Sequence, residues 1–408
     1  MQLCQQPGPN PHQSRTAAFC LSLYLYPPVR NTVVSQTTRT TTLIESVAAL
    51  VKTELAPLTN AIDQEGLYPA DFLHKLGALG GFASAIPKAY GGLELGLDSQ
   101  IDITSLVGRE CGSTAFLTWC QSTCAWYLLH APNETVRARY LPQVAQGKLL
   151  AGTGMSNTVK HLAGIEKIHL SAVREGDGYI VSGSLPWVSN IGKDHLAIVA
   201  ASVGEEGYIM FAVRGDTEGL SLNPCPEFSG LEGTQTLNMR FRNVRIQADD
   251  VLAQPDQFKS FIARIKAGFV LGQLGMGFGI IEGSLKTIRE SNVTTSHVNV
   301  YLDEQGEDIA TKFEALRNQV SSLAPQAENG TALILDILRA RANGSEATLA
   351  AAQSALLHAG AKGYLMRHPA QRRLREAIFV AIVTPALKHL RKEIHDIEQA
   401  QQAKAEAA

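Results

Sequence analysis

Charge, cysteine pairs at metal-ligand spacing and long uninterrupted apolar runs are all scarce in this chain. Charged residues make up 18% of the 408 residues, and the formal net charge is -2. Nucleic acids and anionic membranes attract proteins through clustered positive charge, so this balance excludes an electrostatic footprint for either partner. An anionic ligand must therefore be held by local groups.

The cysteines and the apolar runs exclude further classes. The 6 cysteines form no Cys-x-x-Cys pair, so we predict no metal site and expect buried free thiols in a reducing compartment. The longest apolar stretch beyond the N-terminal segment, 267–281, contains Gln273 and several glycines. It falls short of a membrane span, and the sequence predicts no transmembrane helix.

Acidic residues are missing from the beginning of the chain, where none precedes Glu45. The same segment carries Arg15, Arg30 and Arg39 among Ser, Thr, Gln and Pro. This composition fits an organellar transit peptide, a poorly ordered extension or an over-long start. We therefore treat 1–42 as a disordered or targeting extension. A cytoplasmic location is the expectation, or a mitochondrial one if the extension is a transit peptide.

What is present is a large share of apolar residues, 45%, arranged in zones of different period. In 43–148 apolar residues recur at three-and-four spacing, in 149–254 the period is two, and in 255–400 the helical spacing returns. This order predicts an α+β multidomain fold. We expect an N-terminal helical domain, a middle antiparallel β domain and a C-terminal four-helix bundle.

The glycine and proline residues allow three local predictions within this fold. Glu175-Gly-Asp-Gly reads as a hairpin turn, with Asp-Gly supplying the positive φ. Gly268, Gly272, Gly275 and Gly279 form a stripe without side chains, which lets a neighbouring helix approach closely. Pro385 should break its helix at Thr384.

Several short motifs occur in one order along the chain. They are Pro87-Lys-Ala-Tyr-Gly-Gly, Trp187-Val-Ser-Asn, Phe241-Arg-Asn-Val-Arg-Ile and Arg375-Glu-Ala. Together they resemble the acyl-CoA dehydrogenase superfamily over 43–397. The resemblance implies FAD, or FMN, between the β domain and the bundle of a homodimer or homotetramer. It also implies an acyl thioester substrate, of CoA or a carrier protein, and an electron acceptor or flavin reductase as partner.

The resemblance also implies residues that bind the flavin. Counting back from Ala163-Gly-Ile, which matches a family motif, places Gly154, Met155 and Ser156 on the loop that contacts the flavin. Trp187 stands where the family stacks an aromatic ring on the flavin, although a plain core tryptophan is the alternative. Ser189 replaces a family threonine and is a candidate hydrogen-bond donor to the flavin.

The family's usual catalytic base is missing. Thr384 stands where the family has a glutamate, and a threonine hydroxyl cannot remove an α-proton. Ala263 occupies a second position at which some members place the base. Glu282 and Glu376 fit structural helix positions better than a catalytic role. His358 is a weak acid/base candidate next to a glycine turn.

These observations leave three functions open. The first is an FAD-dependent dehydrogenase that acts on the CH–CH group of an acyl thioester with a displaced base. The second is a reduced-flavin monooxygenase of the same superfamily, which needs no such base. The third is a non-catalytic member. Trp119, Trp126 and Tyr127 either narrow an acyl pocket or belong to an ordinary helix core.

Overall fold

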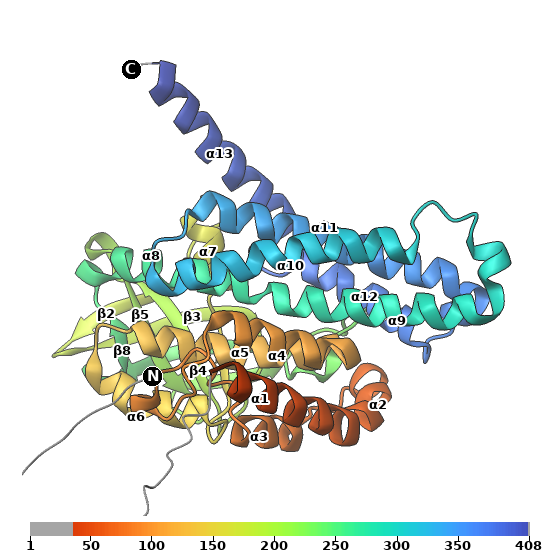
Figure 1. The fold of residues 1–408 in the computed structure, drawn as a ribbon. Coiled ribbons are helices and arrows are strands. Elements are labelled where there is room, and N and C mark those ends of the chain that lie inside the picture. The colour runs from red at the N-terminus through yellow and green to blue at the C-terminus, as the bar shows by residue number, and fades with distance from the viewer. Residues whose placement is uncertain (1–35, 407–408) are drawn as a thin grey trace, which may run out of the picture. The chain divides into compact units, whose positions relative to one another are not determined.

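The computed structural model describes residues 36–406, in which helices come first, strands follow and helices return (Figure 1). This order confirms the predicted fold class. Of the predicted extension 1–42, residues 1–35 lie outside the described residues. Residues 36–42 form the beginning of α1. The bounds of the domains themselves stay a prediction.

The first region is helical because its apolar residues recur at helical spacing, as the first helix shows. Leu43, Val47, Val51 and Leu55 recur every fourth position and are at most 7% exposed. They lie on α1 and on the π-helical turn Val51–Leu55 that continues it. The α-helices are α1 (Gln36–Leu50), α2 (Thr59–Gln64), α3 (Ala70–Ala78), α4 (Leu97–Glu110), α5 (Gly112–His130) and α6 (Glu134–Ala145).

The middle region is a sheet with strand order β6-β7-β3-β2-β4-β5-β8, and β1 pairs with β4. Most pairs are antiparallel, whereas β1 and β2 run parallel to β4. The elements are β1 (Ala151–Thr153), the helix α7 (Ser156–Leu162), β2 (Leu170–Glu175), β3 (Gly178–Val188), β4 (Leu196–Ser202), β5 (Tyr208–Arg214), β6 (Leu220–Pro224), β7 (Leu237–Ile246) and β8 (Val251–Ala253).

The hairpin between β2 and β3 is where it was predicted, but its strained residue is different. Glu175 pairs with Gly178, so the turn consists of Gly176 and Asp177. Gly176 takes the positive φ, 63°, whereas the sequence assigned it to Asp177-Gly178. Glycine at the first turn position removes the Cβ clash there.

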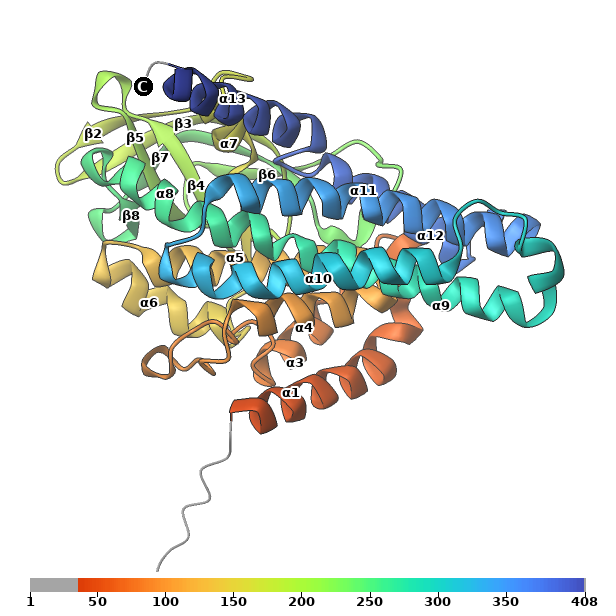
Figure 2. The ribbon, with the colours of Figure 1, turned by 45° about the horizontal axis from the view of Figure 1, so that its top comes forward.

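The last region consists of long helices that pack on one another and on α4 and α5 (Figure 2). The predicted break at Pro385 is confirmed, because α12 ends at Ile382 and α13 begins at Leu387. Leu390 of α13 packs against Leu338 and Ala342 of α11. The helices are α8 (Pro255–Gly272), α9 (Leu274–Asn299), α10 (Gly306–Asn329), α11 (Ile334–Ala359), α12 (Pro369–Ile382) and α13 (Leu387–Glu406).

The glycine stripe lets other helices approach closely, and these helices are α4 and α5. A Cβ on Gly279 would lie 2.5 Å from Cα of Gly108 in α4. A Cβ on Gly268 would lie 2.5 Å from the Trp126 ring in α5. The stripe therefore joins the first and last helical regions of the same chain.

The consecutive helices α8 and α9 form one apolar stretch, Pro255–Asn299, that is long enough to cross a membrane by length and composition. The sequence prediction missed this length because it treated 267–281 alone. In the structure 89% of the apolar window is buried. The contacts with α4, α5 and α11 account for its apolar character.

Candidate functional site

A cavity of about 310 Å³ lies between α5, α7, α8 and the beginning of α13. Its inner wall is apolar, and its ionisable groups come mainly from α13. Tyr127 and Met155 at the wall are at most 3% exposed, whereas the side chains of Lys392 and Asp396 are more than half exposed. The lining residues are Tyr127, Met155, Val159, Leu162, Ala163, Ile262, Ile265, Lys266, Phe269, Val270, Pro385, His389, Lys392, Glu393 and Asp396.

The predicted flavin loop and the residue at the family's base position meet beside this cavity. The hydroxyl oxygens of Ser156 and Thr384 are 2.7 Å apart and hydrogen-bonded. Met155 and Pro385, their chain neighbours, both line the cavity. The structure therefore brings together two segments that the sequence connected only through the family resemblance.

The Thr384 segment is anchored from the opposite side by buried polar groups. Gln273 Nε2 donates to the Thr384 carbonyl at 2.8 Å, and Arg341 Nε donates to Gln273 Oε1 at 2.8 Å. Arg341 is fully buried and also donates to the Val380 carbonyl. Burial lowers the pKa of Arg341 to about 10. These bonds hold the segment between α12 and α13 in one position.

The predicted flavin-stacking residue lies on the sheet, outside the cavity wall. Trp187 is 60% exposed and has φ 56°, which is unusual for a bulky residue. Its side chain is thus largely uncovered by the described part of the chain, and an exposed aromatic ring is of a type that fits a flavin ring.

Two other residues predicted to contact the flavin, Ser189 and Gly154, are in contact with other residues of the protein instead. Ser189 is 6% exposed, and its hydroxyl is hydrogen-bonded to Thr236 at 2.6 Å. The space beside Gly154 is filled by Val199 of β4, since a Cβ on Gly154 would lie 2.5 Å from Val199 Cγ1. Of the predicted residues, Trp187 is uncovered, Met155 lines the cavity and Ser156 is bonded to Thr384.

None of the carboxylates considered from the sequence lines the cavity. Glu376 is 2% exposed and accepts a hydrogen bond from the Gly112 amide at 2.9 Å. Burial raises the pKa of Glu376 against the lowering effect of Arg372 and Arg373. Glu282 is paired with Arg109 at 2.7 Å. Both are structural, as the sequence favoured.

His358 and Ala263 are also away from the cavity. The His358 ring lies next to Ser354 inside α11, with Nδ1 2.8 Å from the Ser354 carbonyl. Its own carbonyl accepts from Ser291 of α9. Ala263 is exposed. The structure thus places His358 in the helix packing rather than at the cavity.

The sequence missed the ionisable residues that the structure does place in the cavity. His389, Lys266 and Glu393 line it, and Lys266 forms an ion pair with Glu393 across α8 and α13. One available signal was that His389 follows Pro385 closely in the sequence, which places His389 in the first turn of the next helix. The direction of the His389 side chain depends on how α13 packs, and the sequence does not show this packing.

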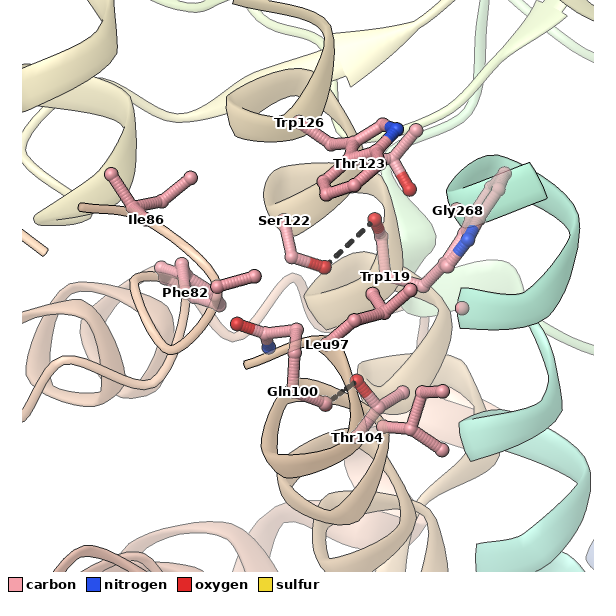
Figure 3. A pocket seen from close by; sticks show the side chains of 13 residues that line it. Phe82, Ile86, Leu97, Gln100, Thr104, Trp119, Ser122, Thr123, Trp126 and Gly268 are labelled. Carbon is pink, nitrogen blue, oxygen red and sulfur yellow. Dashed lines mark hydrogen bonds between the residues drawn. The ribbon is translucent and has the colours of Figure 1, made fainter. Parts of the chain in front are cut away.

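The tryptophans that the sequence associated with an acyl pocket are core residues. Trp119 and Trp126 are at most 5% exposed, and their indole nitrogens donate to carbonyls of α8 at 3.4 and 3.1 Å. Figure 3 shows them among the side chains that line a hollow between α4, α5 and α8. The volume of this hollow is only about 20 Å³. Space for a ligand therefore lies in the larger cavity on the other side of α8.

Known proteins resemble this chain along most of its length. Residues 37–148 match the family model "Acyl-CoA dehydrogenase, N-terminal domain". The "Probable acyl-CoA dehydrogenase YngJ" of Bacillus subtilis is 25% identical over 352 residues, which cover 83% of this chain and 92% of the relative.

Solved structures share the fold. Butyryl-CoA dehydrogenase from Megasphaera elsdenii aligns with a TM-score of 0.79 at 20% identity, covering 89% of this chain and 98% of that one. The prolyl acyl carrier protein oxidase AnaB aligns with a TM-score of 0.72 at 21% identity and the same coverages, 89% and 98%. Sequence motifs, the family model over 37–148 and the shared fold agree, and they support membership of the chain in the acyl-CoA dehydrogenase superfamily.

Proposed function

We propose that this protein is an FAD-dependent oxidoreductase that dehydrogenates the CH–CH group of an acyl thioester. The observation that carries the proposal is the cavity of about 310 Å³ that reaches both Met155 on the predicted flavin loop and Pro385 beside the family's base position. Relatives named acyl-CoA dehydrogenases support the reaction class. A cytoplasmic location, or a mitochondrial one, belongs to the same proposal.

The residues that would hold the flavin are Trp187 and Ser156, together with the backbone of Gly154 and Met155. A bound flavin supplies a two-electron acceptor. The exposed indole of Trp187 would offer a stacking surface, and the Ser156 hydroxyl, which is hydrogen-bonded to Thr384, would offer a polar contact. FMN would use the same ring contacts.

The cavity suits a thioester with an apolar acyl part. Ile262, Ile265, Phe269 and Val270 present apolar surface along one side of α8. The charged side chains are balanced, because Lys266 pairs with Glu393 and Lys392 pairs with Asp396 at 2.6 Å. Lys392 is the more exposed cation and could turn toward a phosphate of CoA or of a carrier-protein prosthetic group.

A second candidate function is a reduced-flavin monooxygenase, for which a flavin reductase would be the partner. The observation that favours it is the threonine at position 384, whose hydroxyl is bonded to Ser156 and offers no base. The dehydrogenase instead requires an electron acceptor. The two candidates differ in whether a thioester alone reduces the flavin.

The proposal is tested by anaerobic absorbance titration of the flavin-loaded protein with thioesters from acetyl-CoA to palmitoyl-CoA and one carrier-protein thioester. We expect at least one of them to bleach the oxidised flavin bands. Trp187→Ala should lose flavin affinity, and Trp187→Phe should retain most of it. Flavin binding without bleaching by any thioester would remove the dehydrogenase and leave the monooxygenase as the leading function.

We further propose a homodimer or homotetramer. The helices α9 and α11 end at the same end of the bundle (Figure 1). Large apolar side chains just beyond these ends, among them Tyr301 and Leu365, are exposed. Exposed apolar surface of this kind marks an interaction site. A second copy of the chain is the partner that the superfamily favours.

A further inference from the structure

The cavity contains one ionisable side chain whose hydrogen bonds the fold leaves open. Tyr127 donates to or accepts from Thr153 at 3.2 Å, Lys266 pairs with Glu393, and Lys392 pairs with Asp396. His389 differs, because its Nδ1 is buried and has no hydrogen-bond partner within residues 36–406. A buried polar atom without a partner is costly, and among the residues that line the cavity His389 is the one that carries such an atom.

The position of His389 is fixed by the helix that carries it. Its backbone amide donates to the Ala386 carbonyl at 2.7 Å in the first turn of α13. The adjacent Leu390 is fully buried against α11. Because Leu390 holds this turn against the bundle, the neighbouring imidazole is directed into the cavity with Pro385 and Met155.

The charges around His389 favour its neutral form. Burial is the main cause that lowers the pKa of His389, the Lys388 and Lys160 charges lower it further, and Glu166 opposes them. Lys266 of α8 and Glu393, which lies on α13 like His389, form their own ion pair. A neutral imidazole has a lone pair available at neutral pH, as a general base requires.

We propose that His389 is the acid/base group that replaces the carboxylate missing at position 384, with Nε2, the ring nitrogen that is not buried, taking the α-proton of an acyl thioester bound in the cavity. This inference rests on the proposed function. The α C–H bond breaks, its electron pair passes into the thioester enolate, and the proton binds to Nε2. Return of a proton from Nε2 regenerates the thioester, so α-proton exchange with solvent requires no oxidant.

The experiment is α-proton exchange in D₂O, followed by NMR on the flavin-loaded protein with excess thioester and without an electron acceptor. The thioester is the one that bleaches the flavin most in the panel from acetyl-CoA to palmitoyl-CoA. His389→Gln should slow exchange by at least about 100-fold, and the matched control His395→Gln should stay within about twofold of the wild type. His395 lies on the same helix but is exposed and outside the cavity lining.

Two further readouts separate a catalytic role from a structural one. Wild-type exchange should fall when the pH drops below the lowered pKa of His389, and the residual rate of His389→Gln should lack this dependence. Diethyl pyrocarbonate should modify His389 more slowly when the thioester is bound, as read by peptide mass spectrometry. Thermal unfolding and flavin absorbance should be the same in both variants and the wild type.

The outcomes are distinguishable. If the thioester bleaches the wild-type flavin but His389→Gln exchanges α-protons as fast as His395→Gln, this inference is wrong and the proposed function stands. Loss of thioester binding together with exchange in His389→Gln would likewise overturn it, because the residue would then be structural. If no thioester bleaches the flavin and the wild type shows no exchange, the proposed function fails.

Discussion

Gly268 and Gly272 lie one turn apart in α8, but the space beside them differs. A Cβ on Gly268 would lie 2.5 Å from the Trp126 ring, whereas a Cβ on Gly272 would lie 3.4 Å from Trp119. Trp126 cannot move easily, because it is 5% exposed and its nitrogen donates to the Ile265 carbonyl. The two glycines therefore have different roles although the sequence shows them as equivalent.

We expect Gly268→Ala to lower the free energy of unfolding by about 1–3 kcal/mol through overpacking. Gly272→Ala should be neutral or stabilise the protein by up to about 1 kcal/mol, because alanine favours the helix and meets only an ordinary contact. Urea denaturation followed by circular dichroism measures both. Equal shifts in the two variants would show that contact with Trp126 is not what requires glycine at 268.

A second prediction at this scale concerns His130, whose ring packs edge-on against Trp126 at 4.2 Å. Burial, with Arg264 and Arg137 nearby, lowers the pKa of His130 to about 3. Between pH 6.5 and about 3 the unfolded state binds a proton that the native state does not, so the free energy of unfolding falls as the pH falls.

His130→Phe keeps the edge contact and removes the titration. The variant should be less sensitive to acid, with a difference in slope of up to about 1.4 kcal/mol per pH unit. Urea denaturation at steps from pH 7 to pH 4 gives both curves. Parallel curves for the wild type and the variant would contradict the pKa shift.

Residue identity at the site was only partly predictable. The family motifs singled out Ser156 and Thr384 separately, and the structure brings their hydroxyl groups together. They did not lead to His389. His389 and His395 are both histidines of one helix, and only the packing of Leu390 on α11 decides which of them faces the cavity.

At the scale of elements, α13 serves as a wall of the cavity while being held mainly by its contacts with α11. Leu390 is fully buried between Leu338 and Ala342. We expect Leu390→Ala to cost about 2–5 kcal/mol of the free energy that docks α13, because it leaves a hole in this small cluster.

The expected result is faster amide hydrogen exchange in α13 and weaker thioester binding, with α4 unchanged. Hydrogen exchange with mass spectrometry and flavin titration check the two effects. Gln399→Ala, at an exposed position of the same helix, is the control. Faster exchange spread evenly over α4 and α13 would mean that α13 does not open as a separate unit.

The ends of helices and strands could be predicted from local residues, whereas the elements that pack against one another could not. The break at Pro385 and the turn before β3 were predictable, because proline and glycine act on their own backbone. The glycine stripe predicted a close helix contact but not its identity. Gly279 meets Gly108 of α4, a pairing that depends on how distant segments fold together.

At the scale of the whole molecule, the apolar end of the bundle predicts self-association. Tyr301 beyond α9 is 85% exposed, and Leu365 beyond α11 is 65% exposed. The double variant Tyr301→Glu/Leu365→Glu should shift an oligomer toward the monomer, because buried charge at an apolar interface is unfavourable. Light scattering after size exclusion measures the mass. Val173→Glu, on the exposed face of β2, is the control and should leave the mass unchanged.

The ion pair between Arg375 and Asp63 has a consequence for synthesis. These residues are 312 positions apart, and the Glu376 carboxylate caps the Gly112 amide from similarly far along the chain. During translation the first helices leave the ribosome long before α12 exists, with Asp63 unpaired and the grooves that receive α9 empty. Native contacts between the two ends of the chain raise its contact order and slow the last folding step. The N-terminal helices therefore leave apolar surface uncovered until the C-terminal helices have been synthesised, and such surface is prone to aggregation.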